Sequence, residues 1–271
     1  MVIPALHIIS MILYGVSALL FGRYFITKNR VAVRYANGSL WIGLLLHTGM
    51  LVLFTLRRGF LPLAQFAEAA TTFAWILGLL YLVQQYLLRE EEFGVFVVGL
   101  VAIVQLISAV VIDYSQPLAE VLQNVMFEIH VVSMLFAYAS FTLGFISALM
   151  YLLLYHDIHG QRFGLFYSRL PSLEFLDKLN IRSVVTGLFL LTFGIVLGAL
   201  NASKAWGFFW EWDPKLTIVF INWLVYLYFA VSHSVFGWRG QRTAVLSIIG
   251  FAVFIISFFL VTNLTSTIHT F

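Results

Sequence analysis

The residues of this sequence with the clearest capacity for metal chemistry are its seven histidines. An imidazole inside or at the edge of a lipid bilayer is costly unless it forms a hydrogen bond or binds a metal, so the depth of each histidine matters. Four of them, His47, His130, His233 and His269, are the main candidate ligands. The sequence contains no cysteine, which excludes disulfides and thiolate metal sites.

A second group of residues consists of three closely spaced tryptophans, Trp206, Trp210 and Trp212, followed by Asp213 and Lys215. Trp206 and Trp210 are four residues apart, so a helical turn places both on one face. A flat aromatic surface where a membrane helix meets water suits a flat, largely apolar ligand. An interfacial tryptophan belt is the plainer interpretation. For Asp213 and Lys215 the plain roles are helix capping and contact with lipid headgroups.

Eight long apolar runs must position these side chains. Of the 271 residues, 62% are hydrophobic and 10% charged, against about half and a quarter in a soluble domain. A membrane-spanning helix needs about 20 apolar residues. The runs lie near residues 3–25, 38–56, 65–88, 93–112, 127–155, 181–201, 215–236 and 243–264. They are apolar on every face, which argues against a β-barrel. We therefore expect an all-α integral membrane protein with eight transmembrane helices in a single domain over 1–271, with a loop at 202–215 between helices six and seven.

The distribution of basic residues predicts the orientation. Eleven of them, from Arg23 to Arg242, fall on one side of the predicted helices, and only Arg57, Arg58, Lys204 and Lys215 fall on the other. Cytoplasmic loops carry the excess of Lys and Arg. Both termini and the tryptophan loop are therefore expected outside the cell (plasma) membrane. The net charge of +3 gives little support for a nucleic-acid partner.

With this orientation, the four histidines form two candidate pairs. His130 and His269 both reach the outer level of the tryptophan loop, and two neutral imidazoles on opposite faces of a macrocycle form a bis-histidine haem site. His47 and His233 lie deeper, at depths that differ by less than the width of a macrocycle, which predicts an inner haem site. His7 competes with His47 as the second inner ligand, but it starts its helix on the outside. We expect one or two haem b groups.

The connecting segments receive plainer interpretations. Arg57–Trp75 is expected to lie on the membrane interface, with the segment from Asp113 to Asn124 alongside it as the roof of an outer cavity. The segment His156–Asn180 is expected to contain a short interfacial helix with Pro171 in its first turn. His156 and His159 are interpreted as solvated, because other metal ligands are absent nearby.

The C-terminal half resembles the cytochrome c assembly family of haem-handling membrane proteins, the CcsA, ResC and HemX group, whose signature is the tryptophan-rich WWD domain. The residues that carry the resemblance are Leu176-Asp177-Lys178-Leu179-Asn180-Ile181-Arg182, Gly187, Leu191-Thr192-Phe193-Gly194-Ile195-Val196-Leu197-Gly198, Trp206-Gly207, Trp210 and Trp212-Asp213-Pro214-Lys215. The resemblance implies an outer haem site ligated by His130 and His269, and a transmembrane haem site that includes His233. Leu216 stands where these assembly proteins usually have a glutamate, and the short length is similar to that of HemX.

Together with this resemblance, the residues predict a haem-binding membrane protein that takes haem from the inner side and presents it at the external WWD site for cytochrome c assembly. The expected partners are haem, the lipid bilayer, apocytochrome c and a CcsB-like membrane protein. A haem transporter or chaperone is favoured over a self-contained enzyme, and participation in a cytochrome c haem lyase stays open. The alternatives are a HemX-like regulator of haem biosynthesis, a haem-dependent membrane oxidoreductase and a transporter of another amphipathic molecule.

Overall fold

The computed structural model describes residues 2–114, 123–161, 163–206 and 214–264, with side chains given except at 204–206, 214–215 and 257–264. Within these residues every regular element is a helix. The helices are α1 (Val2–Thr27), α2 (Arg30–Arg58), α3 (Phe66–Leu88), α4 (Gly94–Val111), α5 (Val125–His159), α6 (Leu165–Arg169), α7 (Leu173–Trp206), α8 (Pro214–Ser234) and α9 (Gln241–Leu264).

Seven of these helices, α1 to α5, α7 and α8, are long and apolar enough to cross a membrane, and the part of α9 with described side chains, Gln241–Ile256, is a shorter apolar helix. The prediction of an all-α integral membrane protein is confirmed at this level. The chain divides into two compact units, Met1–Leu118 and Ala119–Phe271.

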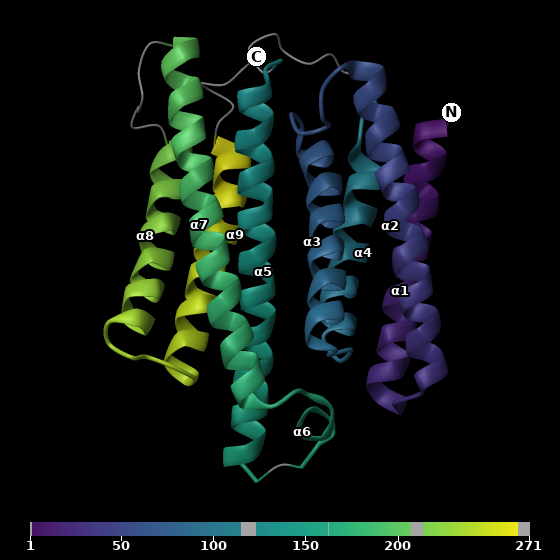
Figure 1. Cartoon of the computed structure of the whole chain (residues 1–271), viewed down its shortest axis with the longest axis vertical. Helices are drawn as coiled ribbons and strands as arrows, with labels where there is room; N and C mark the ends of the chain where they lie inside the picture. Colours follow the sequence, from purple (N-terminus) through teal and green to yellow (C-terminus); the bar gives the residue numbers. More distant parts are fainter. Residues whose placement is uncertain (1, 115–122, 162, 207–213, 265–271) are drawn as a thin grey trace. The chain divides into compact units, whose positions relative to one another are not determined.

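The N-terminal unit contains α1 to α4, which run side by side in Figure 1. Within it, α1 contacts α2 and α4, and α3 contacts α2 and α4. Polar side chains join α1 to α2, because the Ser17 hydroxyl donates to the Ala36 carbonyl at 2.9 Å and the Ser39 hydroxyl donates to the Leu13 carbonyl at 2.8 Å. These bonds satisfy hydroxyl groups that would otherwise be buried without partners.

Helix α2 begins eight residues earlier than the predicted start at residue 38. Asn29 caps it, since its Oδ1 accepts hydrogen bonds from the amides of Val31 at 2.9 Å and Ala32 at 3.4 Å. Basic residues at 30 and 34 interrupt the apolar run, but they are compatible with a helix that extends past the apolar layer into water. At the other end Gly59, with a φ of 86°, occupies the left-handed position that ends the helix.

The C-terminal unit is built on the contact between α5 and α7, with α8 and α9 packed against them (Figure 1). Its buried core contains Ala137, Phe141, Val184, Leu191, Tyr226 and Phe229. The rings of Phe141 and Tyr226 stack with 3.6 Å between centroids and 3° between planes. This core ties α5, α7 and α8 together below the predicted outer site.

The connection after α5 differs from its prediction. Instead of an interfacial helix that starts at Pro171, the structure has the short α6 followed by α7, which already begins at Leu173. The Ser172 hydroxyl caps α7 by accepting from the Phe175 amide at 3.3 Å. Leu176 and Leu179 are buried, so the leucine repeat belongs to the packed first turns of α7.

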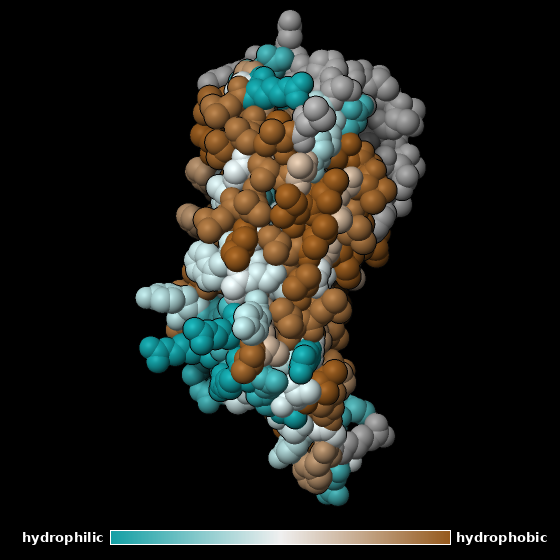
Figure 2. All heavy atoms as spheres, turned by 90° about the vertical axis from the view of Figure 1, so that its right-hand side faces the viewer, coloured by the Kyte–Doolittle hydropathy of each residue, from teal (hydrophilic) through white to brown (hydrophobic). Residues whose placement is uncertain are grey.

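The face of the N-terminal unit seen in Figure 2 is apolar over most of its length, with hydrophilic side chains gathered toward the ends. Exposed large apolar side chains on α1 and α2 include Ile12, Leu19, Ile42, Leu45 and Leu56. Such a surface is incompatible with water and suits contact with lipid chains.

Candidate functional site

Three of the predicted ligands, His47, His130 and His233, have described side chains. Helix α7 extends through Trp206 and α8 already includes Lys215, but the side chains of both lie outside the described set. Trp210, Trp212, Asp213 and His269 lie outside the described residues, as does most of the predicted roof at 115–122. The tryptophan surface and the pairing of His130 with His269 therefore stay predictions.

His130 lies in the second turn of α5 and is half-buried. Its Nδ1 lies 2.6 Å from the carbonyl oxygen of Gly194 on α7. A carbonyl can only accept, so Nδ1 must carry the proton, and in the neutral ring Nε2 then carries the lone pair. This is the arrangement usual for a metal-ligating histidine, whose other nitrogen donates to a backbone carbonyl or a carboxylate.

His233 lies in the last turn of α8 and shows the same pattern. Its Nδ1 is 2.9 Å from the carbonyl oxygen of Trp238, and the Trp238 amide donates in turn to the Ser232 carbonyl at 3.1 Å. Gly237, with a φ of 65°, lets the chain fold back over the end of the helix. The connection between α8 and α9 thus fixes the imidazole of His233 from its Nδ1 side.

His47 is held by hydrogen bonds at both of its ring nitrogens. It is fully buried in the N-terminal unit, with Nδ1 3.0 Å from the Tyr14 hydroxyl and Nε2 2.8 Å from the Thr71 hydroxyl. Thr71 donates to Gln105 at 3.0 Å, and the Gln105 amide donates to the Ser10 hydroxyl at 3.3 Å. To bind iron, His47 would have to break one of its two hydrogen bonds.

His7 lies beside His47. The sequence predicted different depths for the two histidines, but their ring centroids are 6.4 Å apart and the angle between the ring planes is only 17°. The predicted difference in depth between His7 and His47 was therefore wrong, because the antiparallel packing of α1 on α2 brings both rings to one level. His7 Nδ1 is 2.7 Å from the Tyr114 hydroxyl, and its Nε2 is buried with no hydrogen-bond partner among the described residues.

Sequence reasoning missed the polar partners of these two histidines. Tyr14, Thr71, Gln105 and Tyr114 were each read as part of an apolar run or a loop. A signal was available on the first helix, where His7, Ser10, Tyr14 and Ser17 repeat every three or four residues and are all buried. Burial raises the pKa of Tyr114 to about 12, so its hydroxyl stays protonated beside His7.

The remaining histidines of the described residues are His156 and His159, in the last turn of α5. His159 is exposed, with Nδ1 2.9 Å from the Tyr155 carbonyl and its ring stacked on that of Tyr155. A hydrogen bond from Nδ1 to a carbonyl therefore supports the assignment of a histidine as a metal ligand, but it is not sufficient for that assignment. Across the described residues no group of three or more His, Asp or Glu side chains is placed to hold a bare metal ion.

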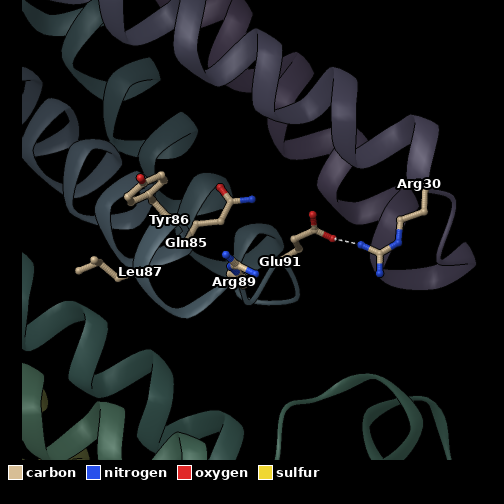
Figure 3. Close-up of a pocket in the computed structure, with 6 residues that line it drawn as sticks. All are labelled: Arg30, Gln85, Tyr86, Leu87, Arg89 and Glu91. Carbon is tan, nitrogen blue, oxygen red and sulfur yellow. Dashed lines mark hydrogen bonds and ion pairs between the residues drawn. The ribbon is translucent and has the colours of Figure 1, made fainter.

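A charged hollow of about 610 Å³ lies at the end of α3 where Arg89 ends the helix, as Figure 3 shows. Arg30 and Glu91 form an ion pair across it at 2.6 Å, and Gln85, Tyr86, Leu87 and Arg89 complete its lining. Lys28 pairs with Glu92 nearby. Partial burial and the neighbouring Glu92 carboxylate raise the pKa of Glu90 to about 7. No histidine is among these lining residues, so the hollow contains none of the predicted haem ligands.

The residue range 5–269 matches the family described as Cytochrome C assembly protein. The chain is similar to the cytochrome c biogenesis protein CcsA of Mesostigma viride, with 25% identity over 98% of this chain and 93% of that protein. It is also similar to CcsA of Chlamydomonas reinhardtii, with 30% identity over 89% of this chain and 67% of that protein.

Among solved structures, the chain resembles the cytochrome c haem lyase CcmF with a TM-score of 0.66 and 14% sequence identity. The likeness covers 94% of this chain but only 46% of that chain, so the chain spans about half the length of the lyase it matches. At this level of identity the likeness concerns the fold.

Proposed function

The chain belongs to the cytochrome c assembly family, and from that membership we propose that it binds haem b and presents it on the outer side of the cell membrane for cytochrome c assembly. The single observation that carries the proposal is the match of residues 5–269 to the cytochrome c assembly family. The hydrogen bond of His130 Nδ1 to the Gly194 carbonyl at 2.6 Å supports His130 as a ligand, because a proton held on Nδ1 leaves the lone pair on Nε2.

The donor set fits haem. The sequence offers no thiolate, and the histidines that it places near the membrane surfaces supply neutral imidazole nitrogens, which suit low-spin haem iron. Bound haem supplies the chemistry of covalent attachment to an apocytochrome, while the chain contributes ligation, orientation and exclusion of water. The residues that would hold haem at the outer site are His130 and His269 as ligands, Trp206, Trp210, Trp212 and Asp213 as contacts of the macrocycle, and Lys215 as a partner for a carboxylate.

We also propose eight membrane spans in one domain, with both termini and the loop 202–215 outside. The excess of basic residues on the opposite side supports that orientation. The long apolar stretch of α9 supports an eighth span, since its helix continues to Leu264. A reporter fused after Phe271 tests the topology, because a cytoplasmic reporter would contradict it.

For the inner site, His233 is the better supported ligand, since its Nδ1 bond to Trp238 has the geometry of His130. His47 remains the proposed second ligand and His7 the alternative, although the two rings lie at one level and both nitrogens of His47 are hydrogen-bonded. A CcsB-like membrane partner and an apocytochrome are proposed as the proteins that complete the assembly reaction. The CcsA relatives, named for cytochrome c biogenesis, support this role.

The test is the haem content of the purified protein, measured by its absorption spectrum and by pyridine haemochrome. We expect His130→Ala to lose the outer haem and His233→Ala to lose the inner haem, whereas His159→Ala, an exposed imidazole anchored in the same way, leaves both. Haem content that is the same in all three variants and in the unmodified protein would remove the ligand assignment. Bound haem that never reaches an apocytochrome would favour the regulator.

A further inference from the structure

Three glycines of α7 face α5 in successive layers of contact. A Cβ atom at Gly187 would lie 2.6 Å from Cδ1 of Phe141, and one at Gly194 would lie 2.8 Å from Sδ of Met134. Real Cβ atoms essentially never come this close to another heavy atom, so a larger residue at either position would force its neighbour to move.

The third layer belongs to His130. A Cβ atom at Gly198 would lie 2.7 Å from its Cε1, 2.9 Å from its Nδ1 and 3.3 Å from its Nε2. The ring of His130 therefore lies against the backbone of Gly198 and fills the volume that a side chain there would need. A glycine at this position is what allows the imidazole to approach α7.

The same antiparallel register produces all three layers. From Gly187 to Gly194 the chain advances seven residues while the partner moves back seven, from Phe141 to Met134; from Gly194 to Gly198 it advances four while the partner moves back four, to His130. His130 is thus placed by the packing of two long helices, with the Phe141 layer in the buried core of the unit.

The ring is also fixed by its bond to Gly194. In a helix the Gly194 carbonyl accepts the amide of the residue four positions later, which is Gly198. A carbonyl oxygen has two lone pairs, so it can accept the His130 Nδ1–H at 2.6 Å as well. One glycine therefore supplies the acceptor and the other supplies the space. Together they restrict both the position of the ring and its tautomer.

We propose that Gly194 and Gly198 are positioning residues for haem ligation by His130: the Gly194 carbonyl holds the proton on Nδ1, and the bare backbone of Gly198 lets the ring reach that carbonyl. The inference rests on the proposed function, since it concerns the ligand of the outer haem. The two glycines act through the imidazole, by presenting Nε2 in a fixed direction.

The first test uses haem-free protein, and its one variant serves only to assign the NMR signal of His130. Nitrogen NMR of ¹⁵N-histidine-labelled protein distinguishes the two neutral tautomers, and the signal lost in His130→Gln identifies His130. We expect the Nδ1–H form. An Nε2–H form, or fast exchange between the two, would overturn the inference whatever the haem content.

The second test compares Gly198→Ala with Gly187→Ala in the full chain. Both add one methyl group to the same face of α7, and the control meets Phe141 at a distance as short as the test variant meets His130. Alanine favours a helix more than glycine does, so a weakened helix cannot explain a loss. Mutation of a group that orients a metal-ligating histidine typically lowers the metal affinity by about 10–100-fold. We expect a loss of this size at the outer haem, with a shift away from the low-spin spectrum, in Gly198→Ala only.

The outcomes separate the inference from the proposed function. If His130→Ala removes the outer haem while Gly198→Ala keeps its affinity and spectrum, the function stands and the positioning role is wrong. If Gly198→Ala changes the His130 tautomer in haem-free protein, but neither His130→Ala nor Gly198→Ala changes haem binding, the positioning role is right and the ligand assignment is wrong. Equal losses in Gly198→Ala and Gly187→Ala would indicate general packing and overturn the inference.

Discussion

His7 and His47 lie with their rings 6.4 Å apart and 17° from parallel inside the N-terminal unit, yet only His47 has both nitrogens hydrogen-bonded. The two imidazoles lie in one buried cluster of hydrogen-bonded side chains but have different roles in it. His47 joins α1, α2 and α3 through Tyr14 and Thr71, whereas His7 joins α1 to Tyr114 beyond the end of α4.

His47→Leu is expected to destabilise the protein by about 1–3 kcal/mol, because it leaves the Tyr14 hydroxyl buried without its partner. Thermal unfolding in detergent measures the loss. His7→Leu is the comparison and should cost less, since it removes one hydrogen bond and a nitrogen that has none. A His47→Leu protein that loses haem yet unfolds at the original temperature would identify His47 as a ligand and contradict the structural role.

Glu68→Ala is expected to destabilise the hairpin of α2 and α3 by about 3–5 kcal/mol, because the Glu68 carboxylate is buried and pairs with Arg58. The variant also removes an acceptor from the Ala64 amide, which donates to Glu68 at 3.2 Å. Limited proteolysis near Gly59 and thermal unfolding report the effect. The exposed pair of Lys178 with Glu174 is the control, and Glu174→Ala should leave both measurements unchanged. Equal behaviour of the two variants would refute the prediction.

Glu90 gives a pH dependence whose direction follows from its raised pKa of about 7. Between its ordinary pKa and this value the folded protein binds more protons than the unfolded chain, so stability falls as the pH rises through that window. Glu90→Gln should remove this decline and stabilise the protein at pH 8 relative to the unmodified chain. Unfolding curves at pH 5, 6, 7 and 8 provide the comparison, and identical pH profiles would exclude the shift.

Asp177 stabilises the start of α9 from a neighbouring helix. Its Oδ1 accepts from the Gly240 amide at 2.9 Å and from the Thr243 hydroxyl at 3.0 Å. Asp177→Ala should cost about 1–2 kcal/mol, the usual effect of losing a helix cap. Asp177→Asn keeps an oxygen acceptor and should cost less. Hydrogen exchange of the first-turn amides of α9 reports on the cap directly, and unchanged protection in Asp177→Ala would disprove its role.

Much of the fold could be predicted from the sequence, because lipid imposes a simple rule on long apolar runs. Each of the eight long apolar runs coincides with a helix of the structure, whereas the interfacial helix expected at Pro171 does not. The other errors lie at helix ends, where α2 extends back to Arg30 and α7 to Leu173. These extensions depend on the helix caps Asn29 and Ser172 and on side chains that extend into water. Hydropathy alone reveals neither feature, so it does not predict where such helices begin.

The sequence by itself determined the membrane class, the number of candidate histidines and the tryptophan-rich stretch, since composition and residue type need no partner to be recognised. Only the tertiary structure decided what each described imidazole contacts. It placed His7 beside His47, occupied both nitrogens of His47, and set His130 against Gly194 and Gly198. The physical reason is that a hydrogen-bond partner on another helix depends on the register of two packed helices, which no run of residues along one helix specifies.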